Sequence, residues 1–152
     1  MQVWIIPKPV NTCSIWKLIY KKYDAAAAYI AETEKKRTAL HIAAIRGRVK
    51  AMKEIVSGCP ACCELVDNRG WNALHYAVAH KRIYVFEECL KIPELATLGT
   101  KKDEKGNTPF HLIAALAHEQ KQWRHCYGEE ERYGLNKRKL SVIDIYEGDF
   151  AE

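Results

Sequence analysis

The sequence lacks any apolar run that approaches the length of a membrane span. Its longest apolar stretches, residues 25–31 and 112–117, fall far short of the roughly 20 residues that a bilayer-crossing helix needs. It also lacks an N-terminal segment of the secretory type, which favours a reducing compartment and free thiols for its six cysteines. We therefore expect a cytoplasmic location and no direct insertion into a membrane.

The chain also lacks the signatures of catalysis. No Gly-rich phosphate loop, nucleophile elbow or paired-carboxylate arrangement occurs, so we expect no enzyme, no catalytic residue and no cofactor. Basic and aromatic residues do not interleave as they do in nucleic-acid modules, so no nucleic-acid partner is expected. The net charge of +5 favours an acidic partner, and the composition, 48% hydrophobic and 28% charged, is that of a globular chain.

Three cysteines close in sequence, Cys59, Cys62 and Cys63, are the sharpest candidate for other chemistry. Two thiolates at this spacing can chelate zinc or form a redox pair. A structural zinc site needs four ligands, and the sequence offers no second pair nearby, so we predict no metal site and interpret these residues as free cysteines at the end of a helix. A metal- or redox-responsive module at this cluster is the alternative hypothesis.

What the chain does contain is an internal repeat. One pattern, a small or polar residue, a small residue or Pro, an apolar residue, His and an apolar residue, occurs at residues 38–44, 72–78 and 108–114. A weaker fourth copy spans residues 141–145, with Asp144 in place of the His. The histidines and Asp144 are separated by 34, 36 and 33 residues. A period of this length predicts a stack of similar helix-turn-helix units.

Each part of the pattern has a physical reason. Four short polar residues fall where a helix needs an N-cap: Thr38, Asn72, Thr108 and Ser141. In repeats two and three, an Asp and a Gly that favour a tight turn precede the motif: Asp67 with Gly70, and Asp103 with Gly106. The histidines at the common register, His41, His75 and His111, are best explained as bonding the backbone of their own or the adjacent turn. We therefore predict a structural role for these seven motif residues.

A second helix of each repeat is predicted from apolar residues at fixed offsets after the His. These are Val49, Met52, Ile55 and Val56 in one repeat, and Ile83, Phe86, Cys89 and Leu90 in the next. Residues 15–20 look like the second helix of an earlier repeat. In repeat three the same registers hold Glu119, Gln122, His125 and Cys126, so we expect that helix to be shifted, short or poorly packed.

With three copies in register, the chain resembles the ankyrin-repeat family over about residues 15–147. The resemblance implies an all-α solenoid of stacked helix-turn-helix units with hairpin loops. We divide the chain into an irregular N-terminus (1–14), a half repeat (15–32), two repeats (33–66 and 67–102), a distorted repeat (103–135), a partial repeat (136–147) and a tail (148–152).

A narrower resemblance rests on residues 60–75 and 103–112. These segments are similar to plant ankyrin proteins that carry a C-terminal PGG-type membrane domain, among them the accelerated-cell-death type. The resemblance implies an array on the cytosolic face of a membrane, with a role in defence, cell-death or stress signalling.

The resemblance also implies a non-catalytic scaffold that binds a protein partner through hairpin tips and the concave face. At the register six before the His all four copies are basic, which suggests a partner with an acidic segment. Trp71 and Arg37 are residue types enriched at binding hot spots, although Trp71 could equally cover a neighbouring repeat. We expect binding to centre on the hairpins at 67–72 and 103–108. The candidate partner-binding residues are Lys35, Arg37, Arg46, Arg69, Trp71, His80, Lys105, Asn107 and Arg138.

Overall fold

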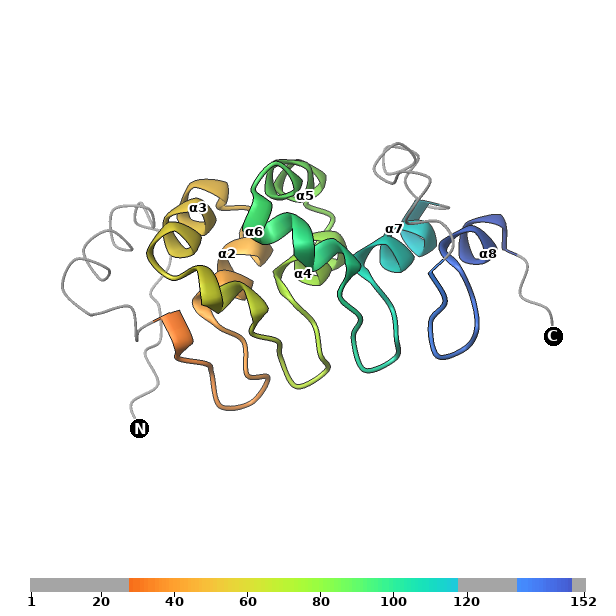
Figure 1. The fold of residues 1–152 in the computed structure, drawn as a ribbon, viewed down its shortest axis with the longest axis horizontal. Coiled ribbons are helices and arrows are strands. Elements are labelled where there is room, and N and C mark those ends of the chain that lie inside the picture. Colours follow the sequence, from red (N-terminus) through yellow and green to blue (C-terminus); the bar gives the residue numbers. More distant parts are fainter. Residues whose placement is uncertain (1–27, 118–133, 149–152) are drawn as a thin grey trace.

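The computed structural model describes residues 28–117 and 134–148. Its helices form two stacked rows, and hairpin loops project from one side (Figure 1). The inner row contains α2 (Ala39–Ile45), α4 (Ala73–Ala79), α7 (Pro109–Ala117) and α8 (Val142–Glu147). The outer row contains α3 (Val49–Gly58) and α5 (Ile83–Leu90). Within the described ranges the only β feature is an isolated bridge between Ala31 and Thr38, so the predicted all-α solenoid is confirmed.

The inner helices begin at the predicted capping residues. The Asn72 side chain accepts hydrogen bonds from the backbone N–H groups of Leu74 and His75, at 2.9 and 3.1 Å. Ser141 accepts one from the N–H of Asp144 at 3.2 Å. The first backbone N–H groups of a helix have no partner inside it, so these side chains supply one. The repeat motif therefore fixes where each inner helix starts.

Small side chains allow the inner helices to pack closely against one another. Ala44, Ala77 and Ala114 are fully buried, and Ala43 is 4% exposed. A helix surface of alanine brings neighbouring helix axes together, and larger residues at these positions would push them apart. The spacing of the hairpins follows from this packing, since each hairpin leads into one inner helix.

The outer helices bury the predicted face. Val49, Met52, Ile55 and Val56 of α3 all lie in the core. In α5, Phe86 and Cys89 are buried as predicted, whereas Ile83 and Leu90 are only partly buried and Val85 is buried in addition. The buried stripe of α5 is thus turned slightly from the predicted one.

Repeat two contains a further short element that the sequence did not predict. After α5 come α6 (Pro93–Ala96) and the 3-10 helix η3 (Thr97–Thr100). They place Leu95 and Leu98 in the core, with exposed fractions of 0% and 1%. The carbonyl of Leu98 accepts a hydrogen bond from the Asn72 side chain at 3.0 Å. The extra residues in the 36-residue interval between His75 and His111 thus form helices that pack into the core.

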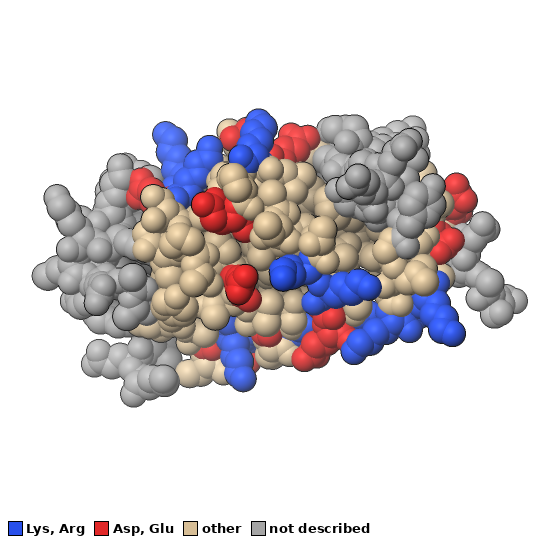
Figure 2. Space-filling model, viewed as in Figure 1, with Lys and Arg blue, Asp and Glu red and all other residues tan. Residues whose placement is uncertain are grey.

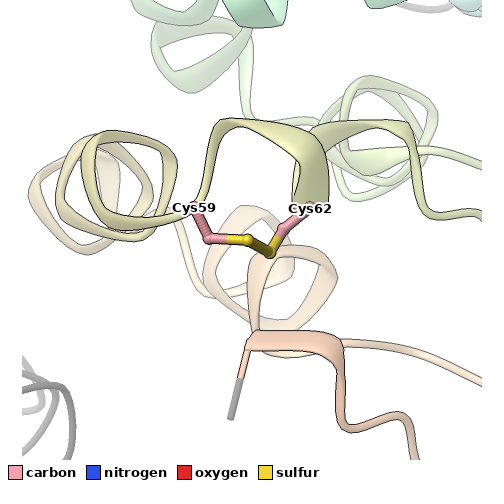
Figure 3. The surroundings of a disulfide bond; sticks show 2 residues. All are labelled: Cys59 and Cys62. Atoms are coloured by element: carbon pink, nitrogen blue, oxygen red, sulfur yellow. A yellow bond between two sulfur atoms is a disulfide. The ribbon is translucent and has the colours of Figure 1, made fainter. Parts of the chain in front are cut away.

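The prediction of free thiols at Cys59 and Cys62 is wrong. Cys59 ends α3 and Cys62 lies in the 3-10 helix η2 (Pro60–Glu64), and the two form a disulfide (Figure 3). Pro60 begins the 3-10 helix directly after Cys59, and this turn brings the side chains of Cys59 and Cys62 together, which spacing alone did not reveal. Cys63 and Cys89 are free and buried. Burial raises the pKa of Cys63 to about 11 and that of Cys89 to about 12, so both remain protonated near neutral pH.

Some predictions lie outside the described residues. These are the helix at residues 15–20, most of the half repeat at 15–32, and the distorted second helix of repeat three with Glu119, Gln122, His125 and Cys126.

Candidate protein-binding surface

Each of the three motif histidines joins the cap of its own helix to a backbone carbonyl further along the chain. The ring Nδ1 of His41, His75 and His111 accepts a hydrogen bond from the backbone N–H of the capping residue, at 2.9, 3.2 and 3.1 Å. Because Nδ1 accepts, the ring proton lies on Nε2, which donates to a backbone carbonyl further along the chain. The acceptors are Trp71 and Asn107 in the next hairpin, at 3.1 and 2.9 Å, and Gly134, just before the last hairpin, at 2.8 Å. These hydrogen bonds agree with the structural interpretation of the histidines.

Burial keeps these rings neutral. Desolvation lowers the pKa of His41 to about 4, and lowers the pKa values of His75 and His111 as well. Asp144 stands at the same register and accepts from the backbone N–H of Ser141 at 2.7 Å. A carboxylate can replace the acceptor Nδ1, but it has no proton to donate to a further hairpin.

The hairpins are built around a turn aspartate and a glycine. Oδ1 of Asp67 accepts from two backbone N–H groups at 2.8 Å, and Oδ1 of Asp103 does the same at 2.9 and 2.8 Å. Gly70 and Gly106 adopt a φ of +77°, which disfavours any side chain. A Cβ atom on Gly70 would lie 2.9 Å from the backbone N of Glu104 in the next hairpin, so glycine permits the close approach of the two loops.

Backbone hydrogen bonds fasten each hairpin tip to the next. The carbonyls of Lys35, Arg69 and Lys105 accept from N–H groups one repeat further on, at 3.1, 3.0 and 3.0 Å. The hairpin row, which we define as residues 33–38, 67–72, 103–108 and 136–141, is therefore continuous. Its basic residues are held one repeat apart by backbone geometry and not by their own side chains.

In the second hairpin the basic and aromatic candidates are bound to one another. The guanidinium of Arg69 lies 3.9 Å from the centre of the Trp71 ring, and it donates to the hydroxyl of Tyr76 at 3.2 Å and to Asp67 at 3.4 Å. Tyr76 donates to Asp67 at 2.5 Å, and Trp71 donates from Nε1 to Asp103 at 3.0 Å. Trp71 thus contacts the next repeat, and the charge of Arg69 is balanced by a buried carboxylate.

The carboxylate of Asp67 is the centre of this network. Burial by itself raises its pKa, but hydrogen bonds from Tyr76, Trp71 and Arg69 outweigh burial and leave the pKa below its usual range. Asp67 is therefore ionised at neutral pH. Tyr76 was not among the sequence candidates, although its place directly after His75 could have indicated a side chain on the hairpin side of α4.

The other candidates differ in how firmly they are held. Arg37 forms two hydrogen bonds with Glu32, one of 2.8 Å, and this interaction raises the Arg37 pKa. Asn107 accepts from the side chain of Asn136 at 2.9 Å. Arg46 and His80 are exposed, and the His80 ring stacks on Tyr76 with centres 6.2 Å apart.

Lys105 and Arg138 belong to a larger basic cluster at the C-terminal hairpins. Its members are all exposed: Lys101, Lys102, Lys105, Lys137, Arg138 and Lys139. Figure 2 shows Lys and Arg side chains gathered along the edge beneath α7 and α8. Within residues 28–117 and 134–148 none of the six forms an ion pair, although Lys102 donates to the carbonyl of Leu135 at 2.8 Å.

The cysteine cluster does not provide a metal site in this state. A disulfide contains no thiolate, so Cys59 and Cys62 cannot ligate zinc as they stand. In the part of the chain that the structure describes, no group of three or more His, Cys, Asp or Glu residues is placed to hold a metal ion. The described residues also contain no helix long and apolar enough to cross a membrane.

Paired helices in two rows, joined by hairpins at a period near 34 residues, define the class of helical-repeat solenoids. A family model described as ankyrin repeats, in three copies, matches residues 10–92, and the chain belongs to the ankyrin-repeat family. Members of this family generally mediate protein–protein interactions and are typically non-catalytic. No curated protein matches the chain.

Proposed function

We propose that the chain is a non-catalytic scaffold that binds an acidic segment of a protein partner along the hairpin row. One observation carries the proposal: the carbonyls of Lys35, Arg69 and Lys105 are fixed by hydrogen bonds between neighbouring hairpins. Basic side chains therefore stand at a regular spacing on a preorganised edge. Binding to such an edge orders little backbone, so less conformational entropy opposes association.

Charge supports an acidic partner. The chain carries a net charge of +5, and the hairpins 103–108 and 136–141, which carry most of the basic cluster, contain one exposed acidic residue, Glu104. Exposed charges of one sign speed encounter with an oppositely charged partner and make binding sensitive to salt. A nucleic acid is not favoured, because its usual binding modules interleave basic residues with stacking aromatic rings.

The test uses a labelled peptide rich in Glu and Asp, with a Lys-rich peptide of equal length as its control, in fluorescence anisotropy. We expect binding of the acidic peptide only, weakened about tenfold by Lys105→Glu combined with Arg138→Glu. The matched control combines Arg48→Glu with Lys50→Glu, two exposed residues at the outer helix α3. Equal weakening by both pairs, or binding that does not depend on salt, would contradict the proposal.

A finer proposal rests on the similarity of residues 60–75 and 103–112 to the plant ankyrin proteins with a PGG-type membrane domain. It assigns the chain to cytosolic defence, cell-death or stress signalling, at a membrane when the membrane domain is present. Sequencing the natural transcript beyond the codon for Glu152 tests it, since a PGG-type coding region there is the expected result.

The disulfide favours a second candidate function, a response to redox conditions. A dithiol reductant such as dithiothreitol would transfer two electrons and two protons, giving two thiols and a cyclic disulfide of the reagent. The cleavage would release η2 from the end of α3. We expect alkylation to label Cys59 and Cys62 only after reduction. Reduction should also change the peptide affinity of the wild-type chain, but not that of the Cys59→Ser variant, which cannot form the disulfide. An unchanged affinity would leave the disulfide a purely structural bond.

A further inference from the structure

An open pocket of about 550 Å³ lies between the third and fourth repeats, lined by their hairpins and inner helices. A volume of this size lies in the range of pockets that hold ligands in proteins. Its floor is apolar, formed by Leu112 and Ala115 of α7 with Leu140 and Ile145 of the last repeat. Its rim is basic and belongs to the cluster described above.

The pocket exists because two registers change between repeats. In repeat two these registers hold Trp71 and Tyr76, whose rings pack edge to face with centres 5.4 Å apart. In repeat three the same registers hold Asn107 and Leu112, which are much smaller. Asn107 also turns toward Asn136, to which it is hydrogen bonded at 2.9 Å. The space that two aromatic rings fill in one repeat is therefore open in the next.

The rim can still accept a charged partner. Lys105, Lys137 and Arg138 line the pocket and form no ion pair with any residue in the described ranges. Glu104 is the single acidic residue in the lining, so positive charge is in excess. The ring nitrogens of His111 already bond Thr108 and Gly134, and that side chain offers no free donor to a ligand.

We propose that this pocket receives one large apolar side chain of a protein segment whose flanking residues are Asp or Glu. The proposal rests on the function proposed above and names the sequence type of the partner. The apolar floor accepts the central side chain, and carboxylates on either side reach the three cations of the rim. No Trp, Tyr or Phe of the described chain lines the pocket, so it offers no platform for stacking a nucleic-acid base.

The test uses two labelled peptides with identical Glu and Asp flanks, one with a central Phe and one with a central Ser. We expect the wild-type chain to bind the Phe peptide about tenfold more tightly, as burial of one aromatic side chain would give. Ala115→Phe should fill the pocket and remove this preference, so that the variant binds the Phe and Ser peptides with equal affinity. Ala79→Phe, at the same exposed register of α4, is the matched control and should preserve the preference.

Helical circular dichroism of both variants shows whether each remains folded. If the wild-type chain binds the two peptides equally and salt still weakens both, the pocket does not receive an apolar side chain. The proposal of an acidic partner would remain. Failure of both peptides to bind would overturn the proposed function itself. Preference for vesicles of phosphatidylserine and phosphatidylcholine over the Phe peptide would assign the basic cluster to a lipid surface and overturn the inference.

Discussion

The hairpin at 67–72 and the two hairpins at 103–108 and 136–141 have nearly the same backbone and carry a basic residue at the same register. In the first, Arg69 stacks on Trp71 and pairs with Asp67. In the others, Lys105 and Arg138 extend from the tip without an ion pair in the described structure. Identical placement thus gives two different surfaces, one satisfied by its own neighbours and one able to bind an external anion.

The two hairpins that the sequence predicted as the binding centre, 67–72 and 103–108, therefore differ in how readily they can bind a partner. Trp71 and Arg69 have the composition of a hot spot, but their polar groups already have partners inside the chain. A ligand would have to compete with those contacts. We therefore propose that binding centres on the C-terminal hairpins and that the Arg69 network mainly stabilises the stack.

The largest expected effect is a loss of stability in acid, at the hydrogen bond that joins His41 to the second hairpin. His41 donates to the carbonyl of Trp71, and burial holds its pKa near 4, below the unfolded value of about 6.5. The unfolded chain binds more protons in this window, so stability falls as the pH drops from about 6.5 to 4, by on the order of 3 kcal/mol from His41 alone. Urea unfolding at several pH values measures this, and a flat profile would contradict it.

Removing the turn aspartate should be the next largest effect. Asp67→Ala leaves two backbone N–H groups and the Tyr76 hydroxyl without their acceptor, which should cost about 2–3 kcal/mol. Asn136→Ala removes the corresponding acceptor of a more exposed hairpin and should cost about 1 kcal/mol. Chemical denaturation of both variants gives the difference, and equal losses would show that the two hairpins are alike.

Substitutions at the glycine register should change the stability of the two C-terminal hairpins in opposite directions. Gly106→Ala puts a Cβ atom 2.7 Å from the backbone N of Lys137 at a φ of +77°, so we expect a loss of about 1–2 kcal/mol. At the same register of the last hairpin, Lys139 has a φ of 61°. Lys139→Gly relieves that conformation and should leave stability unchanged or raise it by up to about 1 kcal/mol. Thermal unfolding checks both, and destabilisation by Lys139→Gly would be the contrary result.

Substitutions at Lys105 and Arg69 should have the smallest effects on stability, but they should distinguish the binding surface from the structural one most clearly. Lys105→Gln should change the free energy of unfolding by less than about 0.5 kcal/mol while weakening the acidic peptide about threefold. Arg69→Gln should lose about 1 kcal/mol of stability, because the stacking on Trp71 and the bond to Tyr76 disappear, with little change in peptide affinity. Paired unfolding and anisotropy measurements test this, and the reverse pattern would restore the 67–72 hairpin as the binding centre.

Several features followed from local sequence because each depends on residues a few positions apart. The caps at Asn72 and Ser141, the turn at Asp67 and the glycine at 70 are of this kind. The α3 face was equally readable from helical spacing. The extra helices α6 and η3 were not, since a segment of eight residues with only two Leu is too short to show a distinctive period.

The repeat, the register of the histidines and the basic residue on every hairpin tip can all be read from the sequence. Which of those basic residues is available to a partner depends on the tertiary structure. The disulfide between Cys59 and Cys62, the bond from Trp71 to Asp103 and the pocket beside Lys105 all arise from the way turns and neighbouring repeats meet. A register gives the place of a side chain within its own repeat, whereas its partners depend on what the adjacent repeat places beside it.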